Sequence, residues 1–155
     1  MKLRFPLALA LLCSACQDSA PGPAPVIAGP QPKKSSAPPA PKAGTLTAIS
    51  INDLFPRQQS GNLLIYDVRP SFVTSFGTIP GAISWPRSDF NSRLPVSETE
   101  IRKARQSGKP TVIFCTDIDC PDARAVAEKL TSRGHDVTIF EGGYAEWKAA
   151  GLPTQ

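Results

Sequence analysis

Two cysteines, Cys115 and Cys120, stand where a hydrophobic run gives way to a helical pattern in the stretch VIFCTDIDCPDARAVAEKL. A cysteine in this setting can be a nucleophile, half of a disulfide, a metal ligand or a buried core residue. The other two of the four cysteines, Cys13 and Cys16, belong to the N-terminal leader. The role of the Cys115 and Cys120 pair therefore decides whether the protein is an enzyme.

The residues around this pair predict alternating strands and helices. Short β-rich runs are expected to form strands at 45–50, 62–68, 82–86, 111–115 and 136–140, and helical patterns fill 51–59, 97–108, 121–134 and 143–151. Strands that are apolar at nearly every position indicate a parallel sheet covered on both faces. We therefore expect an α/β fold with a central, mostly parallel sheet of about five strands and helices on both faces. In such folds ligands bind beyond the carboxyl ends of the strands, where Cys115 lies.

The first forty or so residues differ in composition from this domain. Residues 1–15 join basic residues to an apolar stretch too short to span a bilayer, as in a bacterial signal peptide. The tetrad CSAC resembles a lipobox, which implies cleavage before Cys16 and lipidation of that residue. Cys13 departs from the aliphatic residue usual at its position. Cleavage near Ala15 or Ala20 is the alternative.

Residues 16–44 are rich in proline, alanine and serine. They carry too little apolar surface to offset the entropy of ordering, so we expect a disordered tether ahead of a folded domain at 45–155. Gln17 replaces the aspartate that retains enterobacterial lipoproteins at the inner membrane. The expected location is the periplasmic side of the bacterial cell envelope, with a lipid anchor in the outer membrane and a periplasmic protein partner within reach.

Over residues 45–155 the chain resembles a single rhodanese-like domain. The segment LLIYDVRPSFVTSFGTIPGAISWP is similar to the family's first signature, and DVTIFEGGYAEWKAAGLP is similar to its C-terminal signature. The resemblance implies that Cys115 accepts a sulfane sulfur as a persulfide and passes it to a thiol acceptor. It also implies a substrate-binding loop, formed by Thr116, Asp117, Ile118, Asp119 and Arg124. Asp67 and Arg69 are implied to form a structural pair beside the site.

The cysteine loop departs from the family pattern Cys-x-x-Gly-x-Arg-Ser. It reads CTDIDCPDAR, is about two residues longer, lacks glycine and has three aspartates against Arg124. Nearby carboxylates raise a thiol pKa and repel anionic donors, whereas an exposed helix N-terminus contributes only about 0.3–1 kcal/mol. Thiosulfate is therefore expected to be a poor donor. Capping of the next helix by Asp119 or Cys120, with Pro121 in its first turn, is an alternative role for these residues.

The arrangement Cys-x4-Cys-Pro resembles a rhodanese subgroup with a second cysteine in a lengthened loop, and it leaves three functions open. In the first, Cys120 resolves the persulfide on Cys115 and leaves a disulfide that a periplasmic reductant reopens. In the second, the pair is a thiol–disulfide exchange site. In the third, the domain is a tethered binding module stapled by a structural disulfide. A disulfide requires the two Cα atoms to lie within about 7 Å of each other.

Several other chemistries are not expected. A structural zinc site needs about four thiol or imidazole ligands, which two cysteines and His135, expected in an exposed turn, do not supply. The related tyrosine-phosphatase and arsenate-reductase loops need an arginine where Pro121 stands. The formal net charge is +4, and the domain has no basic run with aromatic residues for nucleic acid. We expect no cofactor and no metal, and no motif identifies the sulfur donor or the thiol acceptor.

Overall fold

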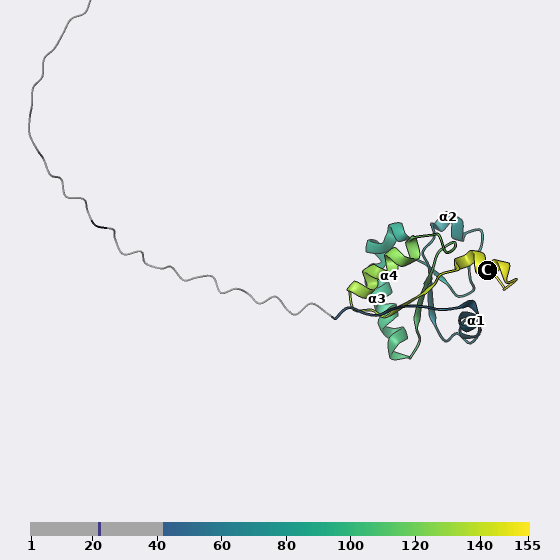
Figure 1. Ribbon diagram of the computed structural model, residues 1–155, viewed down its shortest axis with the longest axis horizontal. Helices are drawn as coiled ribbons and strands as arrows, with labels where there is room; N and C mark the ends of the chain where they lie inside the picture. Colours follow the sequence, from purple (N-terminus) through teal and green to yellow (C-terminus); the bar gives the residue numbers. More distant parts are fainter. Residues whose placement is uncertain (1–21, 23–41) are drawn as a thin grey trace, which may run out of the picture. The chain divides into compact units, whose positions relative to one another are not determined.

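The computed structural model describes Gly22 and residues 42–155 of the chain. The predicted signal peptide, the lipidation site Cys16 and most of the predicted tether lie outside the described residues and stay predictions. The domain between Thr45 and the C-terminus forms one layered unit (Figure 1). None of the helices described is long and apolar enough to cross a membrane.

Strands and helices alternate along the domain, as the sequence predicted. The elements are β1 (Leu46–Ala48), α1 (Ile51–Gln59), β2 (Leu64–Asp67), α2 (Ser71–Thr74), β3 (Ile83–Ser84), the 3₁₀ helix η1 (Arg87–Asp89), α3 (Phe90–Gln106), β4 (Thr111–Phe114), α4 (Asp122–Ser132), β5 (Val137–Phe140) and α5 (Gly143–Ala149). The five strands are all parallel, in the order β1-β5-β4-β2-β3. The predicted α/β fold with a five-stranded sheet is confirmed, and β4, which precedes the cysteine loop, is its central strand.

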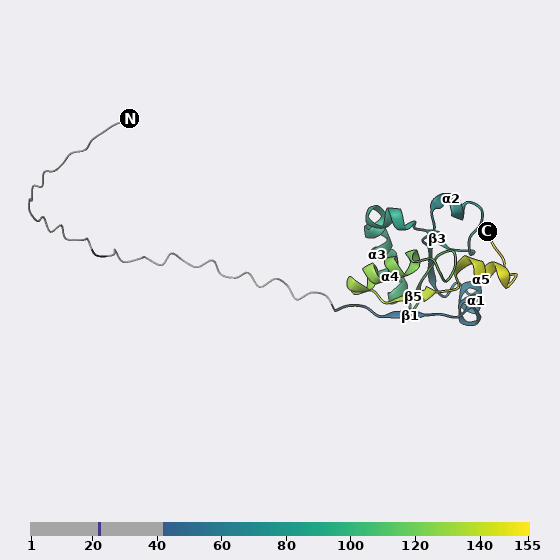
Figure 2. The ribbon, with the colours of Figure 1, turned by 45° about the horizontal axis from the view of Figure 1, so that its top comes forward.

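Helices cover both faces of the sheet, with α3 and α4 to one side and α1 and α5 to the other (Figure 2). Because successive strand residues point to opposite faces, β4 contributes to two cores. Val112 and Phe114 pack in the cluster that contains Trp147 of α5, whereas Ile113 and Cys115 pack in the cluster that contains Leu130 of α4. This alternation directs the Cys115 side chain to the α3 and α4 face.

Helix α3 begins at Phe90, well before the predicted start at 97, and it contains Pro95. The buried Phe90 ring stacks on Trp85 with 5.3 Å between the ring centroids, and this packing outweighs the weak helical pattern of the segment. The sequence also did not predict α2 or η1. Both are short segments at the carboxyl ends of strands, where their positions depend on the sheet.

Acid is expected to weaken the attachment of β1 at the edge of the sheet. The backbone N–H and the hydroxyl of Thr45 both donate to the Asp136 carboxylate, which lowers the pKa of Asp136. A lowered folded-state pKa stabilises the fold above the unfolded-state pKa near 4, and this stabilisation is lost as the pH falls through the folded value. Asp136→Asn should therefore cost about 0.5–1 kcal/mol in urea denaturation at pH 7. The difference from the parent should shrink below pH 4, and a pH-independent difference would contradict the assignment.

Candidate active site

Cys115 follows β4 directly, and a disulfide joins it to Cys120 in the loop before α4. The two Cα atoms are 6.1 Å apart, within the range that a disulfide needs. Cys115 is 2% exposed, whereas Cys120 is half-buried. The sulfur that solvent can reach more easily is therefore that of Cys120.

The start of α5 holds the first part of the cysteine loop. The backbone N–H groups of Tyr144 and Ala145 donate to the carbonyl oxygens of Cys115 and Thr116 at 2.9 and 2.8 Å. Gly143 precedes them with φ +60°, and a Cβ atom there would lie 2.6 Å from the Cys115 carbonyl oxygen. The glycine permits the approach, so the Gly-Gly signature fixes the backbone on which the Cys115 sulfur is mounted.

Asp67 and Arg69 form a buried ion pair at the carboxyl end of β2, the strand next to β4. Arg69 Nε and Nη2 donate to the Asp67 carboxylate at 2.9 and 2.6 Å, and both side chains are at most 2% exposed. Arg69 Nη2 also donates to the Gly77 carbonyl, and the Thr78 hydroxyl donates to Asp67. The Arg69 guanidinium lies 4.1 Å from the centre of the Tyr144 ring. The pair therefore contacts α5 at Tyr144, the residue whose backbone N–H donates to the Cys115 carbonyl oxygen, and it supports the cysteine loop through that helix.

The predicted loop residues take different positions around the disulfide. The exposed Thr116 places its hydroxyl oxygen 4.0 Å from Cys115 Sγ, and the Asp119 backbone N–H donates to the Asp117 carboxylate at 3.1 Å. Ile118 is 73% exposed. Arg124 pairs with Glu141 at 3.1 Å. A hollow of about 160 Å³ brings together four predicted residues, namely Asp117, Ile118, Cys120 and Arg124, whereas Thr116 and Asp119 do not line it.

The alternative role, in which Asp119 or Cys120 caps α4, is wrong. Pro121 occupies the N-cap position of α4, and no side chain forms a capping hydrogen bond there. The path of the loop is determined by the Cys115–Cys120 disulfide and by the hydrogen bond from the Asp119 N–H to the Asp117 carboxylate. Asp122, in the first turn of α4, instead accepts a hydrogen bond from Arg87 Nη1 at 2.7 Å. A carboxylate oxygen of Asp122 and the sulfurs of Cys115 and Cys120 lie within 4.8 Å of one another.

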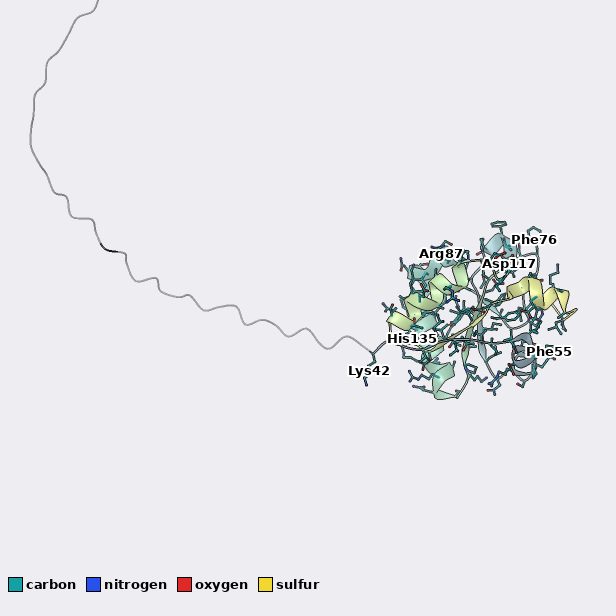
Figure 3. The ribbon with its side chains drawn as sticks, in the orientation of Figure 1. Lys42, Phe55, Phe76, Arg87, Asp117 and His135 are labelled. Carbon is teal, nitrogen blue, oxygen red and sulfur yellow. A yellow bond between two sulfur atoms is a disulfide. The ribbon has the colours of Figure 1, made fainter. Side chains whose placement is uncertain are left out.

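Arg87 is a residue that sequence reasoning missed. It stands 35 positions before Asp122, in η1 after β3, so only the strand order brings it to the site. Figure 3 shows Arg87 and Asp117 at the same end of the domain, away from His135. Arg87 places a positive charge on Asp122, one of the three loop aspartates, and the sequence analysis did not include this charge.

Cys115, Cys120 and Asp122 form the one group of three potential metal ligands among the described residues. In the disulfide the two sulfurs are bonded to each other and are not thiolates. Three donors are also fewer than the four of a structural zinc site. The expected absence of a metal stays a prediction.

A hollow of about 540 Å³ lies beside β1 and the amino-terminal end of β4, away from the cysteine loop, and His135 is among the residues that line it. His135 was expected to be exposed, but its side chain is only 11% exposed and its Nε2 lies 3.2 Å from Glu98 Oε1. The turn folds back onto α3, which sequence spacing does not reveal. This hollow contains no thiol, so its size does not make it the candidate for sulfur chemistry.

A family model described as the rhodanese-like domain matches residues 51–150, and the chain belongs to that family. Membership suggests a sulfurtransferase-type or related function. An HTH-type transcriptional regulator of Mycobacterium tuberculosis is 33% identical over 110 residues, which make up 68% of this chain and 43% of the regulator. The chain thus spans less than half the length of that curated relative.

Solved structures share the fold. A rhodanese-related protein from Thermoplasma volcanium matches with a TM-score of 0.58 and 24% identity, over 70% of this chain and 97% of the other. A protein from Bacillus halodurans matches with a TM-score of 0.58 and 22% identity, over 70% of this chain and 76% of the other. At this sequence identity the two structures show the fold alone and not the function.

Proposed function

We propose that the domain is a rhodanese-type sulfurtransferase in which Cys115 accepts a sulfane sulfur and Cys120 resolves the persulfide. The Cys115 thiolate attacks the sulfane sulfur of a donor, and the rest of the donor leaves with the electron pair of the broken bond. The Cys120 thiolate then attacks Cys115 Sγ, the outer sulfur leaves as hydrosulfide, and the Cys115–Cys120 disulfide forms. A thiol reductant supplies two electrons to reopen it.

One observation carries this proposal. The second sulfur of the loop is within bonding distance of the cysteine at the end of β4, so it can reach a persulfide there without rearrangement of the sheet. The thiol acceptor of the family mechanism would compete with Cys120 for the same sulfur. The closed disulfide equally favours a second candidate, thiol–disulfide exchange on the rhodanese scaffold.

Replacing Cys120 with serine is expected to trap one extra sulfur on Cys115. The protein would be the full chain with Cys13 and Cys16 changed to serine, so that the two loop cysteines are its only thiols. After reduction, the parent and Cys120→Ser are exposed separately to thiosulfate, mercaptopyruvate and a polysulfide, and intact masses are measured.

The variant should gain the mass of one sulfur, and the parent should lose two hydrogens and release sulfide. Cys115→Ser should do neither. Thiosulfate should load least because the loop carries the carboxylates of Asp117 and Asp119, and neither forms an ion pair with any of the described residues. If no donor adds sulfur to Cys120→Ser while the parent still oxidises, the exchange function replaces the sulfurtransferase.

We further propose that the domain works on the periplasmic side of the cell envelope, lipidated on Cys16 and held by the 16–44 tether. The leader composition and the CSAC tetrad support this. In a bacterium that expresses the full chain, Cys16→Ser should move the protein from the membrane fraction to the soluble fraction. Retention of the variant on membranes would argue against the lipid anchor.

A further inference from the structure

A hollow of about 320 Å³ lies beside the disulfide and plays no part in the mechanism above. Val68, Pro70 and Pro86 form its apolar wall, and Arg87, Ser88 and Asp122 supply its polar groups. Its size is at the lower end of small-molecule sites, and its composition of apolar walls with a few polar groups is typical of them. Through Asp122 it adjoins the sulfurs, since a carboxylate oxygen lies within 4.8 Å of both Sγ atoms.

The polar groups of this hollow have opposite charges. Arg87 Nη1 and the Asp122 carboxylate are 2.7 Å apart, and their side chains are 50% and 25% exposed. An ion pair this exposed stabilises the fold by at most about 1 kcal/mol, so a ligand can separate the two groups at small cost. A purely anionic ligand would leave Asp122 without a partner, and a purely cationic ligand would do the same to Arg87. A zwitterion replaces one ion pair with two.

We propose that this hollow binds the amino-acid head of a cysteine-like thiol, with its carboxylate on Arg87 and its ammonium on Asp122. Both charged groups of an α-amino acid are attached to one carbon atom, which suits two protein charges in direct contact. The thiol is one carbon further on, and this short reach matches the separation between Asp122 and the sulfurs.

The bound thiol has a defined reaction at this position. Its thiolate attacks the more exposed Cys120 Sγ, a mixed disulfide forms, and Cys115 leaves as a thiolate. A second thiol attacks the mixed disulfide, releases the symmetrical disulfide of the small thiol and leaves Cys120 as a thiolate. Two thiols thus supply the two electrons that the protein disulfide takes up. The claim that such a thiol acts in the sulfur-transfer cycle rests on the proposed function. The claim that the hollow binds it does not.

The test compares four small thiols as reductants of the Cys115–Cys120 disulfide, in the full chain with Cys13 and Cys16 changed to serine. Cysteine carries both charges, cysteamine lacks the carboxylate, 3-mercaptopropionate lacks the ammonium, and 2-mercaptoethanol lacks both. Rate constants are expressed per thiolate, from the mass of alkylated protein against time, because the four thiol pKa values differ. Cysteine and 2-mercaptoethanol have the same net charge before thiol ionisation, so the general field of the protein does not separate them.

In the parent, cysteine should react at least about tenfold faster than each of the other thiols, and its rate should saturate. In Arg87→Gln the rate constant for cysteine should fall to that for cysteamine. In Asp122→Asn it should fall to that for 3-mercaptopropionate. Arg102→Gln, which removes an exposed arginine on α3 paired with Glu98, is the matched control and should keep the preference.

Equal rates for cysteine and 2-mercaptoethanol in the parent, or a preference that survives both variants, would overturn this proposal and leave an ordinary surface ion pair. This outcome is separate from failure of the proposed function. If Cys120→Ser takes up no sulfur, the sulfurtransferase falls whether or not cysteine is preferred. If Cys120→Ser loads sulfur and cysteine is not preferred, the amino-acid site alone falls.

Discussion

Replacing Gly143 with alanine is expected to displace the cysteine loop and to lower the free energy of unfolding by roughly 2–4 kcal/mol. The alanine Cβ would lie 2.6 Å from the Cys115 carbonyl oxygen and 2.8 Å from the Asp117 backbone nitrogen. These neighbours are backbone atoms, so no side-chain rotation relieves the contact. The loop must move away from α5, which breaks the hydrogen bonds from the Tyr144 and Ala145 N–H groups.

Gly151→Ala is the matched control for this prediction. Gly151 has φ +67°, close to the +60° of Gly143, but a Cβ atom there would meet nothing within 4 Å. The control therefore has the left-handed backbone penalty of about 1 kcal/mol without the steric contact. Urea denaturation measures the stability of both variants, and reduction by a dithiol measures access to the disulfide. Equal loss of stability in the two variants would show that the close approach of α5 to the loop contributes nothing.

The sequence predicted the sheet well because each strand carries its own local pattern. The runs at 62–68, 111–115 and 136–140 are apolar at nearly every position, and all three became buried parallel strands. The position of Cys115 at the carboxyl end of the central strand follows from the same pattern and from the parallel connections.

The parts of the site that the sequence did not predict depend on contacts between distant segments. Arg87 reaches Asp122 only because η1 follows β3 and α4 follows the loop after β4, so that both begin beyond the carboxyl ends of the parallel strands. The early start of α3 depends on the Phe90 and Trp85 rings, and the path of the Cys120 loop depends on the disulfide rather than on capping. Local helix and turn preferences contain none of this information.

The second large effect is expected at the buried ion pair behind the site. Arg69→Met should cost about 3–5 kcal/mol, because it leaves the 1%-exposed Asp67 carboxylate buried without its cation. The double variant Asp67→Asn, Arg69→Met removes the unpaired charge and should be more stable than Arg69→Met alone. The Thr78 hydroxyl remains able to donate to the new amide oxygen.

This reversal distinguishes a buried charge from lost packing. If Arg69 acted only through its contact with the Tyr144 ring, adding Asp67→Asn would increase the loss and the two effects would add. Urea denaturation of the two single variants and the double variant, at one pH near 7, measures the coupling. Because the backbone N–H of Tyr144 donates to the Cys115 carbonyl oxygen, Arg69→Met should in addition speed reduction of the Cys115–Cys120 disulfide, whereas the double variant should restore part of the protection.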